Sequence, residues 1–132
     1  MSRSVLNVLI VEDEEVLAKN IGTYLRRYGY DVRIAHSAEA GLSELEAFKP
    51  DAILLDFNLP GGMNGLEALV RIRAIDRNIK VIMMTAYGSD ELALKAVEGG
   101  ACRFVAKPIS VGVLKKILEE AIVDKPLDEA TF

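Results

Sequence analysis

Short apolar runs alternate five times with longer amphipathic stretches along the chain. The runs have strand length and predict strands at Val5–Val11, Asp31–Ala35, Ala52–Leu55, Lys80–Met84 and Cys102–Val105. The first, third and fourth runs are almost wholly apolar, which is typical of strands covered on both faces. The second run is shorter and more polar, so we place it at an edge of the sheet.

The stretches between the runs have helical spacing. They predict helices from about Val16 to Leu25, from Ala38 to Phe48 after a Ser37 cap, from Leu66 to about Ile75, from a Ser89 cap to Gly99-Gly100, and from Val113 to Ile122. Regular alternation of strand and helix predicts a parallel sheet with right-handed crossovers. For five strands the common open order is 2-1-3-4-5, so we predict a flavodoxin-like, doubly wound (βα)5 fold of the α/β class with helices on both faces.

The composition narrows the class of protein. A chain of 132 residues fits one domain, which we place at 1–123, and residues 124–132 form a polar tail or the start of a linker. The net charge of −4 argues against nucleic-acid binding through the domain's own field. Cys102 is the only cysteine, which excludes an intrachain disulfide and a Cys-rich zinc site. No apolar run has membrane-spanning length or forms a signal peptide, so we expect a cytoplasmic protein without membrane contact.

Polar residues follow the predicted strands at one rim of the sheet. In a doubly wound sheet the ligand site lies beyond the carboxyl ends of the strands, between strands one and three. Glu12 and Asp13 follow strand one, Asp56 follows strand three, and Thr85 and Lys107 follow strands four and five. Clustered carboxylates repel one another unless a positive group holds them. Lys107 is one such group, and a hard divalent cation such as Mg²⁺ is another.

These residues suit phosphoryl transfer to a carboxylate. An ionised Asp is a competent nucleophile toward phosphorus, and an acyl phosphate forms when a metal and a lysine neutralise the phosphoryl oxygens. Thr85 is then available to donate a hydrogen bond to a phosphoryl oxygen.

Four ordered segments carry a family resemblance: Val8–Glu14, Asp51–Gly61, Val81–Ala86 and Gly100–Pro108. Together they resemble the receiver domain of two-component response regulators over residues 5–123. The resemblance implies that Asp56 is the phosphoacceptor for a histidine kinase or phosphotransfer protein. It implies a signalling switch, not an enzyme, with self-catalysed phosphoryl transfer and slow autodephosphorylation only. Its downstream partner would be an effector protein, a fused output domain or a second copy in a phosphorylation-dependent homodimer.

The resemblance also assigns metal ligands. Asp13 and Asp56 would contact Mg²⁺, with Mn²⁺ as an alternative, and Glu12 would act mainly through water. The backbone carbonyl of Asn58 would complete the set.

A second group of residues is assigned to the phosphoryl oxygens and to signal output. Thr85 and Lys107 would bind those oxygens, and the peptide bond before Pro108 is expected to be cis. Phe104 matches the switch aromatic whose rotamer is coupled to Thr85. Signal would leave through the face formed by the fourth helix, the fifth strand and the fifth helix.

Two features depart from the common family pattern. The loop Gly61–Gly65 is one residue longer than usual, and Glu12 stands where Asp is more frequent. Both features, and Tyr87 two residues after Thr85, can alter metal affinity or phosphoryl lifetime.

Other functions were weighed against the same residues. His36 suggests a phosphohistidine relay, but a solvated loop residue fits its place beside an edge strand better. A haloacid dehalogenase-type phosphohydrolase needs an acid two residues after its nucleophile, where this chain has Asn58. A flavodoxin-like electron carrier needs a phosphate loop after strand one, and the acids from Glu12 to Glu15 would repel a flavin phosphate.

Overall fold

The computed structural model describes residues 5–86 and 90–123, without the side chains of residues 90, 92 and 93. The predicted cap at Ser89, the nearby Tyr87 and the tail 124–132 lie outside the described residues.

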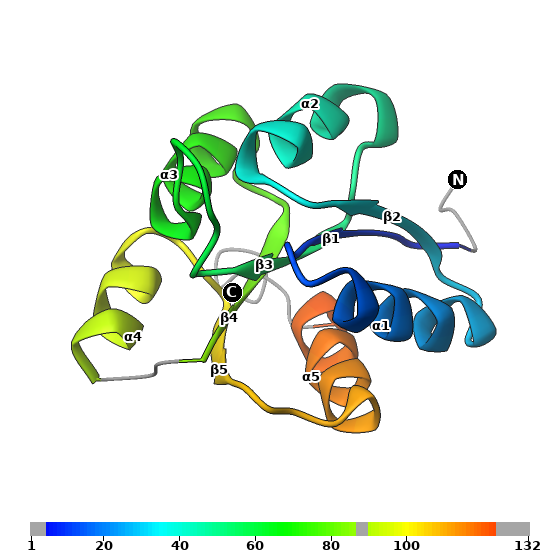
Figure 1. Cartoon of the computed structure of the whole chain (residues 1–132). Helices are drawn as coiled ribbons and strands as arrows, with labels where there is room; N and C mark the ends of the chain where they lie inside the picture. The colour runs from blue at the N-terminus through cyan, green and yellow to red at the C-terminus, as the bar shows by residue number, and fades with distance from the viewer. Residues whose placement is uncertain (1–4, 87–89, 124–132) are drawn as a thin grey trace, which may run out of the picture.

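A five-stranded parallel sheet forms the centre of the molecule (Figure 1). Its strands are β1 (Asn7–Val11), β2 (Asp31–Ala35), β3 (Ala52–Asp56), β4 (Lys80–Thr85) and β5 (Arg103–Ala106). Their order is β2-β1-β3-β4-β5, and all neighbouring pairs are parallel. The predicted flavodoxin-like, doubly wound fold is confirmed.

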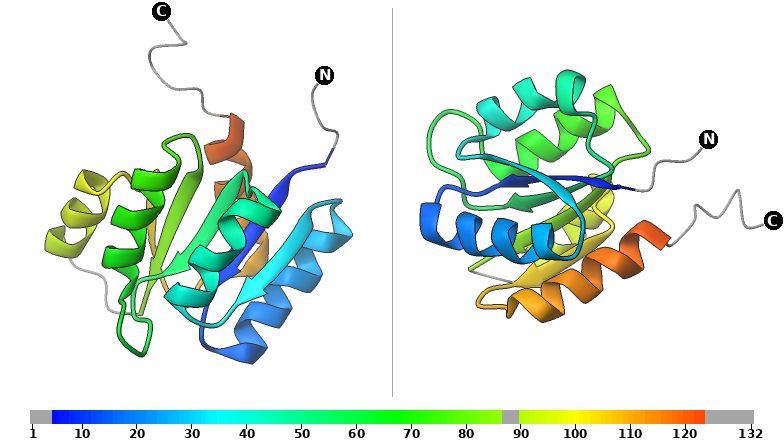
Figure 2. Two further views of the ribbon diagram at one scale, coloured as in Figure 1. Left: turned by 90° about the horizontal axis from the view of Figure 1, so that it is seen from above. Right: turned by 90° about the vertical axis from the view of Figure 1, so that its right-hand side faces the viewer.

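Helices cover both faces of the sheet (Figure 2). They are α1 (Glu15–Arg27), α2 (Ala38–Phe48), α3 (Gly65–Ile75), α4 (Asp90–Glu98) and α5 (Val111–Val123). One apolar cluster joins the sheet to α1 and α5, and the other joins it to α2, α3 and α4. Side chains alternate between the two faces, so Val8 and Ile10 enter the first cluster while Leu9 and Val11 enter the second. Because helices cover both faces of the sheet, the central strands β1, β3 and β4 are almost entirely apolar in sequence.

The strand boundaries differ from the sequence prediction by one or two residues. β1 begins at Asn7, because Val5 is exposed and Asn7 is held by a 2.7 Å bond from its N–H to Asp51 Oδ2. β3 and β4 each run one residue further, to Asp56 and Thr85, because both of those residues still pair with the next strand. β5 is shifted to Arg103–Ala106. Two of the predicted site residues are therefore the last residues of central strands.

The loop before α3 ends in a capping box. The Asn64 side chain accepts from the Glu67 N–H at 2.9 Å, and the Glu67 side chain accepts from the Asn64 N–H at 3.1 Å. The sequence prediction started this helix at Leu66 and did not identify Asn64 as its cap. Among the described residues no helix combines the length and the apolar character needed to cross a membrane.

Candidate functional site

Three carboxylates meet at the carboxyl ends of β1 and β3. Glu12 and Asp13 follow β1, Asp56 ends β3, and one oxygen of each lies within 4.8 Å of the others. Glu12 is 0% exposed and Asp56 2% exposed, whereas Asp13 reaches the surface. Two buried carboxylates at this distance repel each other unless positive charge is present.

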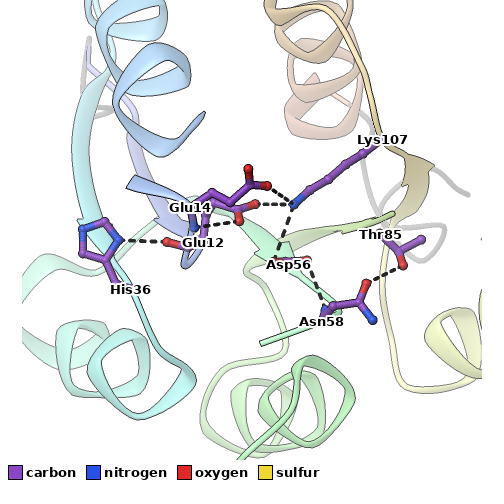
Figure 3. A network of polar contacts seen from close by, with 7 residues as sticks. All are labelled: Glu12, Glu14, His36, Asp56, Asn58, Thr85 and Lys107. Atoms are coloured by element: carbon purple, nitrogen blue, oxygen red, sulfur yellow. Dashed lines mark hydrogen bonds and ion pairs between the residues drawn. The ribbon is translucent and has the colours of Figure 1, made fainter. Parts of the chain in front are cut away.

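Lys107 brings positive charge to this cluster from the end of β5 (Figure 3). Its Nζ lies 2.7 Å from Glu12 Oε1, 3.6 Å from Asp56 Oδ2 and 3.8 Å from Glu14 Oε1. Burial alone lowers the pKa of Lys107, but the hydrogen bond that Lys107 donates to Glu12 and the charges of the surrounding carboxylates outweigh burial and raise that pKa above its ordinary value. The side chain is therefore an ammonium at neutral pH. The peptide bond between Lys107 and Pro108 is cis.

Asp56 remains only partly compensated by this ammonium. Burial, and to a smaller degree the negative charge of Glu12, raise its pKa to about 7, although the Asn58 N–H and Lys107 act in the opposite direction. The cluster thus holds three carboxylates against one ammonium, and its donor atoms are oxygens. Such a set fits a hard divalent cation and gives no soft or nitrogen ligand to a transition metal.

Asn58 and Thr85 lie on the opposite side of Asp56 from Glu12. The Asn58 N–H donates to Asp56 Oδ1 at 3.0 Å, and the Thr85 hydroxyl donates to Asn58 Oδ1 at 2.8 Å (Figure 3). Thr85 is 0% exposed, while Asn58 is exposed. The loop after β3 therefore connects the carboxylate to the end of β4.

Phe104 lies close to this rim on β5. It pairs with Met83, and Thr85 two residues later pairs with Ala106, so Phe104 and Thr85 are diagonal neighbours on one face of the sheet. Phe104 is half-buried and packs against the apolar cluster under α2, α3 and α4. Its side chain thus has partial access to the surface and a buried hydroxyl beside it.

A close approach of α3 to β3 fixes the acceptor loop. A Cβ on Gly65 would collide with the Asp56 carbonyl oxygen and lie 2.6 Å from Phe57 Cα. The Gly65 N–H donates to the Phe57 carbonyl at 3.1 Å. The Gly61–Gly65 loop therefore ends in a residue whose lack of a side chain lets α3 approach the end of β3 closely.

Two contacts at the site were missed by sequence reasoning. No role at the site was predicted for Glu14 from the sequence, yet its N–H donates to Glu12 Oε2 at 3.1 Å and its carboxylate approaches Lys107. His36 is exposed as expected, and its Nδ1 lies 2.9 Å from the Glu12 carbonyl oxygen. Its only sequence signal was its place on the second strand-to-helix loop, at the same rim.

Comparison with known proteins agrees with this geometry. The model of the response regulator receiver domain matches residues 8–119. The chain belongs to the receiver domain family of two-component response regulators. Its acidic triad of Glu12, Asp13 and Asp56 is typical of the Mg²⁺ site of receiver domains.

Several relatives are similar over the whole domain. Sporulation initiation phosphotransferase F of Bacillus subtilis is 33% identical over 113 residues, which cover 86% of this chain and 90% of the relative. A cyclic di-GMP phosphodiesterase of Thermotoga maritima is 34% identical over 117 residues, covering 89% of this chain and 31% of that protein. The crystal structure of a response regulator receiver domain protein from Methanospirillum hungatei superposes with a TM-score of 0.86 at 30% identity, covering 91% of this chain and 95% of that one.

Other relatives are much longer than the receiver domain. The chain spans 31% of the phosphodiesterase and 27% of the transcriptional regulatory protein ZraR of Salmonella typhimurium. The shared part is the receiver domain, and the activities in those names belong to the whole proteins.

Proposed function

We propose that this receiver domain accepts a phosphoryl group on the Asp56 carboxylate, with Mg²⁺, from a histidine kinase or phosphotransfer protein. The observation that carries the proposal is the placement of Asp56. It is a buried carboxylate at the end of a central strand, held between Lys107 and the Asn58 N–H and partly uncompensated. Such a carboxylate is suited to attack a phosphoryl group, whose oxygens can also bind a metal cation at the same site.

The reaction forms one bond and breaks one. A carboxylate oxygen of Asp56 attacks phosphorus, the bond from phosphorus to the donor nitrogen breaks, and its electron pair leaves with the donor imidazole. When bound, Mg²⁺ neutralises charge on the phosphoryl oxygens.

The chain's own residues would divide the remaining work. Lys107 stays protonated beside Asp56 and supplies positive charge to the phosphoryl oxygens. Thr85 would donate its hydroxyl hydrogen to another of them. The Asn58 N–H holds Asp56 Oδ1 in place while the other oxygen faces Lys107. Slow hydrolysis of the product is consistent with Asn58, because its amide has no acidic proton to give to a leaving group.

Metal binding is expected to depend on the two acids after β1 to different degrees. Both oxygens of Glu12 are already engaged, one by Lys107 at 2.7 Å and one by the Glu14 N–H at 3.1 Å. Asp13 is exposed and lies at the mouth of the cluster. We therefore assign direct metal contact to Asp13, Asp56 and the Asn58 carbonyl, and contact through water to Glu12, with Mn²⁺ as an alternative ion.

The signal would leave through α4, β5 and α5. Phosphorylation adds about −1.5 to −2 charges and new acceptor oxygens at Asp56. Movement of Thr85 toward them would vacate space into which Phe104 can turn. Two packings that differ by a few kcal/mol suffice for such a switch. The partner that binds this face would be an effector protein, a fused output domain or a second copy of the domain.

Labelling with a small phosphoryl donor tests the proposal. Acetyl phosphate with Mg²⁺, followed by intact mass measurement, should give one adduct that Asp56→Asn abolishes. Asp51→Asn is the matched control, because Asp51 is a half-buried aspartate at the opposite end of β3. Full labelling of Asp56→Asn would refute the assignment of the acceptor.

A further inference from the structure

Asn58 touches two groups that the proposed reaction uses. Its backbone N–H donates to Asp56 Oδ1 at 3.0 Å, and its side-chain Oδ1 accepts from the Thr85 hydroxyl at 2.8 Å (Figure 3). Its side chain lies at the surface, whereas the side chains of Asp56 and Thr85 are buried. One exposed residue therefore contacts both the acceptor carboxylate and the buried hydroxyl.

The Thr85 hydroxyl carries a single hydrogen, and that hydrogen is directed at Asn58. A phosphoryl group on Asp56 offers acceptor oxygens and no donor at neutral pH. Thr85 can serve such a group only if it redirects the same hydrogen. A full-strength bond to Asn58 and one to the phosphoryl group therefore exclude each other.

We propose that Asn58 is a positioning residue whose side chain holds Thr85 in the resting orientation and so opposes the phosphoryl-bound state. The inference rests on the proposed function, because it assumes that Thr85 binds a phosphoryl oxygen. The net contribution of one neutral hydrogen bond corresponds to a change of roughly 2- to 12-fold in an equilibrium constant. Loss of the Asn58 acceptor should shift the equilibrium toward the phosphoryl-bound state by that factor.

Substitution by alanine isolates the side chain. Asn58→Ala keeps the backbone N–H that holds Asp56 and the backbone carbonyl assigned to the metal. It removes the side-chain amide group, including the oxygen that accepts from Thr85. Because the Asn58 side chain is exposed, the variant should still fold, with an unfolding midpoint lowered only by the loss of the single hydrogen bond to Thr85.

Beryllofluoride with saturating Mg²⁺ is the probe, since it stands in for the phosphoryl group. The chain has no tryptophan, so binding is followed through amide chemical shifts. Asn58→Ala should bind beryllofluoride roughly 2- to 12-fold more tightly than the wild type. Without beryllofluoride, the Thr85 amide shift of this variant should already move toward the bound position. Asn78→Ala, at an exposed asparagine remote from the site, should change none of these values.

A double-mutant cycle with Thr85→Val decides whether the effect acts through the hydroxyl. Valine keeps the shape of threonine but has no hydrogen to donate, so Asn58→Ala should have no effect in that background. Unchanged or weaker beryllofluoride binding by Asn58→Ala, or an equal gain in the Thr85→Val background, would overturn the inference while the proposed function stands. If the wild type binds no beryllofluoride and takes no label at Asp56, the proposed function itself fails.

Discussion

The carboxylate of Asp56 should destabilise the metal-free protein, so Asp56→Asn should be more stable than the wild type at pH 8. Asparagine resembles the protonated carboxyl in shape and carries no charge. Its Oδ1 can still accept from the Asn58 N–H, the bond that holds Asp56 at 3.0 Å. The substitution removes the contact of Asp56 Oδ2 with Lys107 at 3.6 Å, but Lys107 keeps its closer bond to Glu12 at 2.7 Å.

The size of the expected gain in stability follows from the pKa of Asp56. The pKa of Asp56 rises from 3.8 to about 7 in the folded protein, mainly because the group is buried. This difference corresponds to an upper limit of about 4 kcal/mol in the free energy of unfolding. Because an amide only approximates the protonated carboxyl to which this limit refers, we expect a gain of about 2 to 4 kcal/mol for Asp56→Asn.

The gain should depend on pH in a defined direction. Between pH 3.8 and about 7 the folded wild type holds a proton that the unfolded chain has released, so its stability falls as pH rises. Above about pH 7 both states are ionised and the penalty is constant. The advantage of Asp56→Asn should therefore be full at pH 8 and vanish toward pH 4.

Urea unfolding in the presence of a chelator measures this difference. Asp76→Asn is the control, because it makes the same change at an exposed aspartate outside the site and should stay within about 0.5 kcal/mol of the wild type. Added Mg²⁺ should stabilise the wild type and have little effect on Asp56→Asn. Equal or lower stability of Asp56→Asn at pH 8 would refute the claim that the resting site holds an uncompensated charge.

Other substitutions test separate parts of the site. Gly65→Ala should lower the free energy of unfolding by about 2 to 4 kcal/mol in urea unfolding, since its methyl group meets backbone at the end of β3, whereas Gly62→Ala has room and should be nearly neutral. Asp13→Ala should weaken Mg²⁺ binding, measured by titration, more than Glu12→Ala does; the reverse order would mean that their roles are exchanged. Beryllofluoride should shift the amide signals of Phe104 and α4; changes confined to the residues around the acceptor would contradict output through α4, β5 and α5.

The strand pattern was sufficient to predict the fold but not every boundary. The alternation of five strand-length runs with helical stretches predicted the parallel sheet, and the common open arrangement for five strands predicted its order. The polar residues at the ends of β3 and β4 could not be assigned to these strands from the sequence pattern. Asp56 and Thr85 belong to their strands because they pair with Met84 and Ala106, and that pairing depends on neighbours distant in the sequence.

The candidate site was predictable where the rule of strand ends applied. Glu12, Asp56 and Lys107 come together because parallel strands end at one rim, whatever the loops do. The contacts made by loop side chains were not predictable in this way. The bond from Thr85 to Asn58 depends on the course of the loop after β3, which Gly65 and the cap of α3 determine.

The rigidity of the sheet keeps the charged side chains of the site close together. Both faces of β1, β3 and β4 are buried, so the strand ends are held in place and cannot relax to separate their charges. The repulsion between Glu12 and Asp56 therefore persists in the metal-free state and adds to the effect of burial, which is the main cause of the raised pKa of Asp56. A bound cation would relieve this repulsion and offset the negative charge of a phosphoryl group on Asp56, whereas the bond between Asn58 and Thr85 would oppose the change. The balance between this electrostatic effect and the single hydrogen bond would determine what fraction of the phosphorylated domain adopts the state in which Thr85 binds the phosphoryl group.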